Sequence, residues 1–311
     1  MRKIVVAGSL NMDLVAGVRE FPAAGETVLG EDFRTFAGGK GANQAYAAAR
    51  LGARVAMLGQ VGNDAAGEAQ IRNLASVGVD TDSIGRDPDR PSGTAIIAVD
   101  AAKENRIIVI PGANGTFTPE RLEKSRELLT GAALVLLQLE IPLDTVLAAA
   151  RRARDGGARV MLDPAPARPL PAELVERVDY LTPNLGELAT LTGTRLGADS
   201  PIGDIIAAAR DLCARGARKV IVKLGGRGAL LVSRDEYHPW PVFQVEPVDT
   251  TAAGDCFNAA FAVALVEGRS EIEAGVFASA AAACSVTRPG AQASMPSREE
   301  VEALVTRTRS V

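Results

Sequence analysis

The stretch Asp-Thr-Thr-Ala-Ala-Gly-Asp at residues 249–255 runs directly into apolar residues at helical spacing, from Cys256 to Glu267. This pattern predicts a small-residue turn that leads into a helix N-terminus. The first N–H groups of a helix have no partner inside it, and the helix macrodipole adds partial positive charge there. Such a turn can bind a phosphate through its backbone alone. Asp255 would stand beside that anion, where a carboxylate can take a proton from an attacking hydroxyl.

The same stretch has a simpler interpretation. Asp255 could be a first-turn acid that interacts only with the helix dipole, and Gly254 could serve only a tight turn. The rest of the chain separates the two interpretations.

Outward from this turn, short Val/Ile/Leu runs alternate with alanine-rich helical segments. The expected strands are Ile4–Ala7, Arg54–Leu58, Ala133–Leu139, Val160–Asp163, Tyr180–Thr182 and Lys219–Lys223. The expected helices are Gln44–Leu51, Arg121–Leu129, Leu143–Arg154, Ile205–Ala214 and the segment after Asp255. This alternation predicts a doubly wound α/β fold, with a mostly parallel sheet and helices on both of its faces.

Two regions depart from that alternation, at residues 14–36 and 93–110. Both show strand-like alternation with turn residues between and no helix, as in Arg-Ile-Ile-Val-Ile at residues 106–110. We expect them to form a small antiparallel sheet that projects from a single α/β domain spanning residues 1–311. Two extra hairpins at the edge of the main sheet are the alternative.

Composition narrows the function. A net charge of −4 leaves no basic surface for nucleic acid or an anionic membrane, and no apolar run is long enough to span a bilayer. The cysteines are odd in number and lie in apolar contexts, which favours free thiols in a reducing cytoplasm. Because His238 is the only histidine, any general base should be a carboxylate or a lysine.

Polar side chains follow two of the expected strands. Asn11 and Asp13 come after Ile4–Ala7, and Glu140 ends the strand Ala133–Leu139. Open α/β sheets bind ligands at the carboxyl ends of their strands, and sugar hydroxyls need converging carboxylates and amides. An exposed turn acid at Asp13 is the alternative interpretation.

Asn184 and Glu187 stand three apart, so both fall on one face of a helical first turn. This pair suits a hydrated Mg²⁺ and phosphate oxygens, but it also matches a capping box. The residues alone leave both open. A glycine-rich turn after Lys223 allows close approach to its backbone by a ligand, although a hairpin turn is the alternative. Its glycines are Gly225, Gly226 and Gly228.

Two of these stretches resemble a known family. Residues 249–255 resemble the Asp-Thr-x-Gly/Ala-Ala-Gly-Asp signature of the ribokinase-type (PfkB) carbohydrate kinases, and Gly-Gly-Lys-Gly-Ala-Asn at residues 38–43 resembles that family's sugar-binding loop. The resemblance runs from Lys3 to the C-terminal helix. It implies transfer of the γ-phosphoryl group of ATP to the O5 hydroxyl of D-ribose. A kinase for another pentose, a hexose or a nucleoside, or a non-catalytic sugar-binding protein, is the alternative.

The resemblance also implies roles for individual residues. The general base would be Asp255, with an anion hole at Ala252, Ala253 and Gly254. The sugar would contact Asn11, Asp13, Gly39, Lys40, Asn43, Glu140 and Asp255. The nucleotide would contact Asn184, Glu187, Lys223, Gly225, Gly226, Gly228, Gly254 and Ser279.

Two metals and one partner complete what the resemblance implies. Mg²⁺ would be held through water by Glu187. Potassium would be bound by Asp249, Thr251, Ser285, Arg288, Gly290 and Ser294. A second copy of the chain would contact the projecting sheet, giving a homodimer. Asp163 stands where some members carry Asn, which bears on the finer sugar preference.

Overall fold

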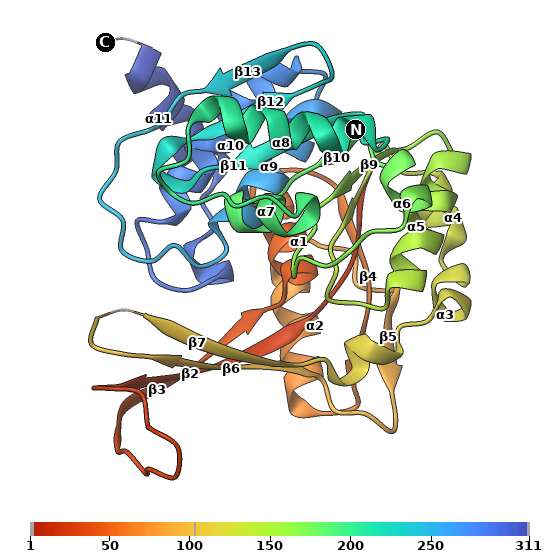
Figure 1. The fold of residues 1–311 in the computed structure, drawn as a ribbon. Coiled ribbons are helices and arrows are strands. Elements are labelled where there is room, and N and C mark those ends of the chain that lie inside the picture. Colours follow the sequence, from red (N-terminus) through yellow and green to blue (C-terminus); the bar gives the residue numbers. More distant parts are fainter. Residues whose placement is uncertain (1–2, 103, 310–311) are drawn as a thin grey trace.

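Nine strands form the main sheet of the computed structural model, which describes residues 3–102 and 104–309 (Figure 1). They are β1 (Ile4–Ala7), β4 (Val55–Gly62), β5 (Ile84–Asp87), β8 (Leu134–Leu137), β9 (Arg159–Leu162), β10 (Tyr180–Leu181), β11 (Lys219–Lys223), β12 (Ala229–Val232) and β13 (Tyr237–Trp240). Their order is β13-β12-β11-β10-β9-β8-β1-β4-β5. The strands from β11 to β5 are parallel, and β12 and β13 extend one edge in antiparallel pairing.

The main sheet is covered on both faces. In β1, Ile4 and Val6 belong to one hydrophobic core, whereas Val5 and Ala7 belong to the other, and all are fully buried. Successive side chains of a strand point to opposite faces, so a strand covered on both sides is apolar at every position. This arrangement confirms the doubly wound α/β fold.

Different helices cover the two faces. The first core takes residues from α1 (Lys40–Arg50), α2 (Ala65–Ser76), α9 (Ala253–Val266), α10 (Glu271–Ser285) and α11 (Arg298–Arg309). The second takes residues from α3 (Pro119–Glu123), α4 (Arg126–Thr130), α5 (Leu143–Asp155), α6 (Ala172–Glu176), α7 (Leu185–Thr192) and α8 (Ile202–Ala214). Within residues 3–102 and 104–309, no helix is long and apolar enough to cross a membrane.

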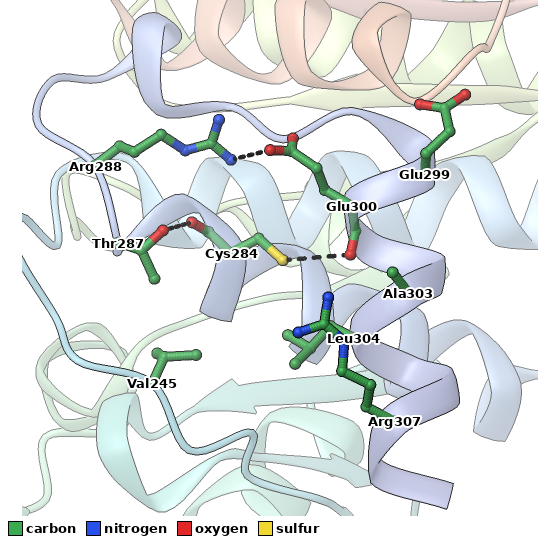
Figure 2. Close-up of a pocket in the computed structure, with 9 residues that line it drawn as sticks. All are labelled: Val245, Cys284, Thr287, Arg288, Glu299, Glu300, Ala303, Leu304 and Arg307. Atoms are coloured by element: carbon green, nitrogen blue, oxygen red, sulfur yellow. Dashed lines mark hydrogen bonds and ion pairs between the residues drawn. The ribbon is translucent and has the colours of Figure 1, made fainter.

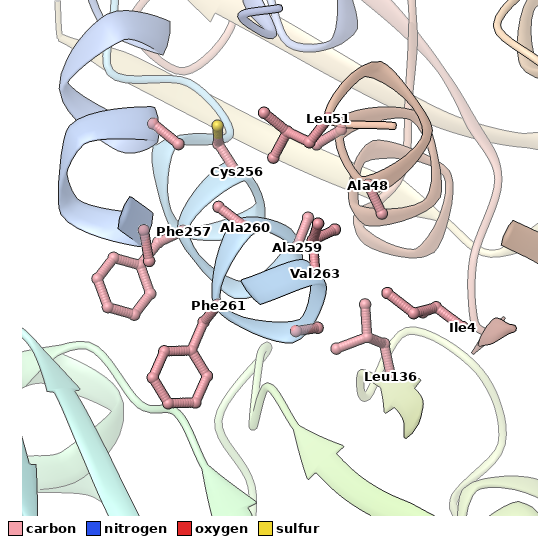
Figure 3. Packing of buried hydrophobic residues seen from close by; sticks show 14 of the residues in the cluster. Ile4, Ala48, Leu51, Leu136, Cys256, Phe257, Ala259, Ala260, Phe261 and Val263 are labelled. Atoms are coloured by element: carbon pink, nitrogen blue, oxygen red, sulfur yellow. The ribbon is translucent and has the colours of Figure 1, made fainter. Parts of the chain in front are cut away.

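Helix α9, which follows the turn at residues 249–255, is buried along nearly its whole length. Figure 3 shows its side chains packed among those of α1 and the main sheet, with Ala259 and Val263 on the side of Ala48 and Leu51. A helix that is apolar all round is a core helix. The N-terminus of α9, and with it Asp255, is therefore held in a fixed position relative to α1.

A second sheet projects from the main body and has the order β3-β2-β6-β7 (Figure 1). Its strands are β2 (Asn11–Val18), β3 (Gly30–Gly38), β6 (Gly93–Val99) and β7 (Asn105–Ile110). This confirms the projecting sheet, called the lid below. Both hairpins are antiparallel as expected, but the central pair β2 and β6 is parallel, so the sheet is mixed. The reason is that β2 and β6 follow parallel strands, β1 and β5, and leave the main sheet in the same direction.

Three of the expected helices differ from the structure by more than one residue. The expected helix Arg121–Leu129 is two short helices, α3 and α4. Helix α1 begins at Lys40 rather than Gln44, and α8 begins at Ile202 rather than Ile205. The glycine-rich segment before Gln44 indicates a loop. In the structure, however, a Cβ on Gly41 would lie 2.7 Å from the backbone nitrogen of Ser9. That glycine therefore permits close packing inside a helix.

Candidate active site

The expected site residues converge where the lid joins the carboxyl ends of the main-sheet strands. Asn11 and Asp13 lie on β2 just after β1, and Lys223 ends β11. Glu140 lies in the turn after β8, which ends at Leu137. The N-termini of α1 and α9 point into the same region and supply Lys40 to Asn43 and Ala253 to Asp255.

Asp255 is buried, with 4% of its surface exposed. It accepts hydrogen bonds from Asn43 Nδ2 at 2.9 Å and Gln44 Nε2 at 3.0 Å. Burial raises its pKa to about 6, against the positive charge of Lys40 and the two amide hydrogen bonds, which lower it. A carboxylate with this pKa can accept and release a proton near neutral pH.

The candidate sugar contacts lie side by side. Glu140 accepts hydrogen bonds from Asn11 Nδ2 at 3.4 Å and from the backbone nitrogen of Lys40 at 3.2 Å. Burial raises the pKa of Asp13 to about 7, and the nearby charges of Glu140 and Asp255 add to this shift. The result is a cluster of carboxylate and amide groups, as sugar hydroxyls require.

The loop glycines are needed for this crowding. A Cβ on Gly38 would collide with the carboxylate of Asp13, and Gly39 has φ of 88°, a left-handed conformation that favours glycine. The backbone of the predicted sugar loop therefore lies in close contact with the Asp13 carboxylate.

Lys40 supplies a positive charge close to the carboxylates of the site. Burial acts to lower its pKa, but four carboxylates raise it well above its usual value, so the ammonium stays charged. These carboxylates are Asp255, Asp163, Glu140 and Glu187.

The turn before α9 is strained. Ala252 has φ of 59°, which makes it the one non-glycine residue with positive φ in the described part of the chain. Such backbone is costly for a residue with a Cβ and often marks functional turns. The N–H of Ala253 donates to Thr250 O at 3.3 Å, whereas Gly254 and Asp255 occupy helix positions whose N–H groups have no acceptor within the helix.

Lys223 lies against this turn. A Cβ on Gly254 would be 3.2 Å from Lys223 Nζ, and the same Nζ is 3.0 Å from Asp163 Oδ1. The predicted anion hole thus has an ammonium group beside it, as a developing phosphate charge needs.

Asn184 and Glu187 form the capping box that was one of their two interpretations. Glu187 N donates to Asn184 Oδ1 at 2.8 Å, and Asn184 N donates to Glu187 Oε2 at 2.7 Å. Burial raises the pKa of Glu187, and the nearby charge of Asp163 raises it further, as expected for two neighbouring carboxylates. A bound cation would relieve this repulsion, so the capping box does not exclude a ligand. Oxygen ligands of this kind fit a hydrated Mg²⁺. No cluster of three acidic, His or Cys side chains that could hold a metal directly occurs within the described ranges.

The remaining residues expected to contact the nucleotide lie near the end of β11 and on α10. Gly225 and Gly226 are exposed, and Gly225 and Gly228 have positive φ. Ser279 Oγ is buried and has no hydrogen-bond partner in the part of the chain that the structure describes. Buried hydroxyls are usually paired, so this one stands out among the described side chains.

Two of the expected potassium residues, Thr251 and Gly290, contact Asp249. Its carboxylate accepts hydrogen bonds from the backbone nitrogens of Thr251 and Gly290, both at 2.8 Å. Burial acts to raise the pKa of Asp249, but these bonds lower it overall, so the group is a carboxylate. The hydroxyls of Ser285 and Ser294 donate to the backbone carbonyls of Ala282 and Ala291. This oxygen-rich set fits a monovalent cation.

Arg288 could contribute to the expected potassium site only through its backbone carbonyl, because a guanidinium is itself a cation. Its guanidinium is 3.0 Å from Glu300 Oε1, in a hollow of about 450 Å³ between α10 and α11 (Figure 2). Cys284, Glu299 and Arg307 line the same hollow. None of the expected sugar or nucleotide residues lines it, so it is separate from the carboxylate cluster.

Sequence reasoning missed three amides that hold the site together. Gln44 donates to Asp255 and Asp163, Gln138 donates to Gln44, and Gln292 Nε2 donates to Asn43 Oδ1 at 3.2 Å. Asn114 was also missed, and it fixes the Asn11 amide through a 2.8 Å bond to Oδ1. Polar residues on helices and turns usually face solvent, and only the position of Gln44 next to Asn43 gave a signal.

Comparisons with known proteins agree with this geometry. A family model described as "pfkB family carbohydrate kinase" matches residues 1–298. The chain is 44% identical to a ribokinase of Bacillus subtilis, covering 98% of this chain and all of that protein. It is 40% identical to a deoxyribokinase of Salmonella typhi, covering 96% of each. The solved structure of Arabidopsis thaliana ribokinase complexed with ribose and ATP aligns with a TM-score of 0.92 at 36% identity and covers 98% of both chains.

Proposed function

The chain belongs to the pfkB family of carbohydrate kinases, and we propose that it is a ribokinase, which transfers the γ-phosphoryl group of ATP to O5 of D-ribose. The observation that carries the proposal is the buried carboxylate of Asp255. It lies at the N-terminus of α9, bonded to Asn43 of the sugar loop and one residue from the turn that faces Lys223. A base between a sugar loop and an anion site is what phosphoryl transfer to a hydroxyl requires.

In this mechanism the sugar lies between the lid and the main sheet. Asn11, Asp13, Asn43 and Glu140 hold its hydroxyls, so the O5 hydroxyl faces Asp255. As O5 bonds to the γ-phosphorus and the bond to the ADP oxygen breaks, the hydroxyl proton passes to Asp255 Oδ. The turn at residues 252–254 and Lys223 stabilise the charge on the transferred group.

Two ions fit the residues present. Mg²⁺ would be held through water by Glu187 near Asp163, and it supplies charge neutralisation on the phosphates when bound. Potassium would be held by the Asp249 set, with Thr251, Ser285, Gly290, Ser294 and the Arg288 backbone. Asp249 joins residue 290 to residue 251, and so keeps the anion-binding turn in place.

Deoxyribose is the second candidate substrate, because a deoxyribokinase is 40% identical to this chain. A panel of D-ribose, 2-deoxy-D-ribose, a hexose and a nucleoside, with coupled detection of ADP, separates the candidates. We expect the highest kcat/KM for D-ribose. Ribose binding by calorimetry without ADP formation would instead identify a non-catalytic sugar-binding protein.

We also propose a homodimer formed through the outer face of the lid, which is the face opposite Asp13. The strand register places Phe33, Ile96, Ile108 and Ile110 on this face, because Phe33 pairs with Ala16, and Ile96 with Leu14 and Ile108. All four are between 43% and 65% exposed. Clustered apolar surface of this kind marks interaction sites.

The cytoplasm is the compartment we propose, with residues 1–311 acting as one catalytic domain. The three cysteines, Cys213, Cys256 and Cys284, are free thiols, which supports a reducing environment.

A further inference from the structure

Gln44 joins the two buried carboxylates of the site. Its Nε2 lies 3.0 Å from Asp255 Oδ1 and 3.2 Å from Asp163 Oδ2, and the side chain has no exposed surface. An amide NH₂ has two hydrogens, so each carboxylate receives one. Ionised carboxylates only accept hydrogen bonds, which fixes the amide orientation, and Gln44 Oε1 in turn accepts from Gln138 Nε2 at 2.7 Å.

The two carboxylates would otherwise repel each other. Asp255 and Asp163 are 4% and 3% exposed, so water screens their charges poorly. On its far side Asp163 pairs with Lys223, the ammonium that faces Gly254. Gln44 is therefore the central link in a chain that runs from the anion-binding turn to the base.

We propose that Gln44 is a positioning residue for phosphoryl transfer. It holds the Asp255 carboxylate toward the sugar hydroxyl and holds Asp163 where it directs Lys223 to the phosphoryl group. The inference rests on the proposed role of Asp255 as general base. Gln44 itself touches neither substrate in this arrangement, because both of its amide hydrogens and its oxygen are used within the protein.

The pH dependence of kcat tests the proposal. Gln44→Met keeps the volume of the side chain but removes both donated bonds. Asp255 loses one hydrogen bond to its charged form. The apparent pKa of the acid limb in the kcat profile should therefore rise by about one unit. At pH 6, near the pKa of Asp255, kcat should then fall about fivefold, with nearly full recovery at pH 8.5.

Gln60→Met is the matched control. Gln60 is equally buried and also donates to a buried carboxylate, Asp87, at 2.8 Å, but it does not contact the site. This variant should lose stability and keep the wild-type acid limb.

A second readout does not depend on activity. The pKa of Asp255 is about 6 when folded, so below that pH the group is protonated and gains little from Gln44 as a donor. The destabilisation caused by Gln44→Met should therefore be larger at pH 8 than at pH 5 in chemical denaturation. A side chain that only fills space would cost the same at both pH values.

Gln44→Glu covers the case in which the methionine variant does not fold. It keeps the side-chain length but adds a third carboxylate, so the acid limb should move further upward. Wild-type acid limbs in the folded Gln44 variants would overturn the proposal. A wild-type enzyme without an acid limb, or an Asp255→Asn variant that retains one, would instead contradict the assignment of Asp255 as the base.

Discussion

The two sheets of this molecule contain similar strand residues but bury them very differently. In the main sheet Ile4, Val135 and Val220 are fully buried, whereas Ile107 and Ile108 of the lid are 53% and 62% exposed. The main sheet is covered by helices on both faces, whereas among the described residues no helix lies over the far ends of lid strands β3 and β7 (Figure 1). A covered sheet is a rigid support, and an uncovered apolar sheet serves contacts with other molecules.

The same contrast divides the chemistry. The main sheet and α9 supply the proposed base, the proposed anion-binding turn and Lys223, whereas lid strand β2 supplies Asn11 and Asp13. We therefore expect substitutions on the main-sheet side to change turnover, and those on the lid side to change binding or assembly.

The largest expected effect is at Asp255. Asp255→Asn should lower kcat by a factor on the order of 10²–10⁴, because the variant cannot accept the hydroxyl proton. Sugar and nucleotide affinity should change little in calorimetry. Asp179→Asn is the control, since Asp179 is a buried carboxylate that pairs with Arg154 at 2.9 Å and is remote from the site. A kcat near the wild-type value in Asp255→Asn would show that Asp255 is not the base, and turnover could then not be assigned to the main-sheet side through this residue.

Lid-side substitutions should act on binding. Asp13→Ala should weaken ribose binding by about 1–3 kcal/mol, because desolvated sugar hydroxyls lose a partner. Titration calorimetry measures this directly. Asn43→Ala should cost a similar amount although Asn43 lies on α1, since it borders the same sugar site. Unaltered ribose affinity in both variants would contradict the placement of the sugar.

The pH dependence of stability sharpens the role of Asp13, which lies where the sheets meet. Its folded pKa is about 7, against an ordinary value of 3.8, so between these values the folded state binds more protons than the unfolded state. The unfolding free energy of the ligand-free protein should therefore fall as pH rises from about 4 to about 7. Asp13→Asn should reduce this slope in urea unfolding series. An identical slope in the variant would mean that Asp13 is not responsible.

The proposed cation site involves the segments before α9 and after α10, and its effect should be smaller. Replacing potassium by sodium at equal ionic strength should lower kcat several-fold, since sodium fits a carbonyl cage sized for potassium less well. Ribose affinity should stay constant, and Asp249→Ala should abolish the response. Activity indifferent to potassium, in protein shown by metal analysis to hold no monovalent ion, would refute the cage.

The smallest effect on turnover is expected at the outer face of the lid. Phe33→Thr with Ile108→Thr should convert a dimer to a monomer in light scattering and change kcat per chain less than about twofold, because these residues lie opposite Asp13. A wild-type monomer at the same concentration would show that this face has another use.

The sequence predicted the fold well because its strands are continuous apolar runs and its helices are alanine-rich. It also identified Asp255, Asn43 and Glu140, which the structure brings together. Gln44 was not predictable in the same way. Its role depends on Asp163 and Asp255, which lie 119 and 211 positions away in the sequence. No local pattern encodes such a contact.

The lid shows a second limit. Alternation located its strands, but the parallel pairing of β2 with β6 depends on how both leave the main sheet. The cap at Asn184 shows a third, because one spacing serves both a helix cap and a ligand.

The hydrogen bonds of Asn43 also set when the enzyme can first act. Asn43 bonds to Asp255 and Gln292, which follow it by 212 and 249 positions. At a translation rate of about 5–20 residues per second, Gln292 is added roughly 12 to 50 seconds after Asn43. Throughout that interval the nascent chain has its sugar loop but no completed base site. A nascent chain that has not yet reached Asp255 and Gln292 should therefore lack the proposed base site.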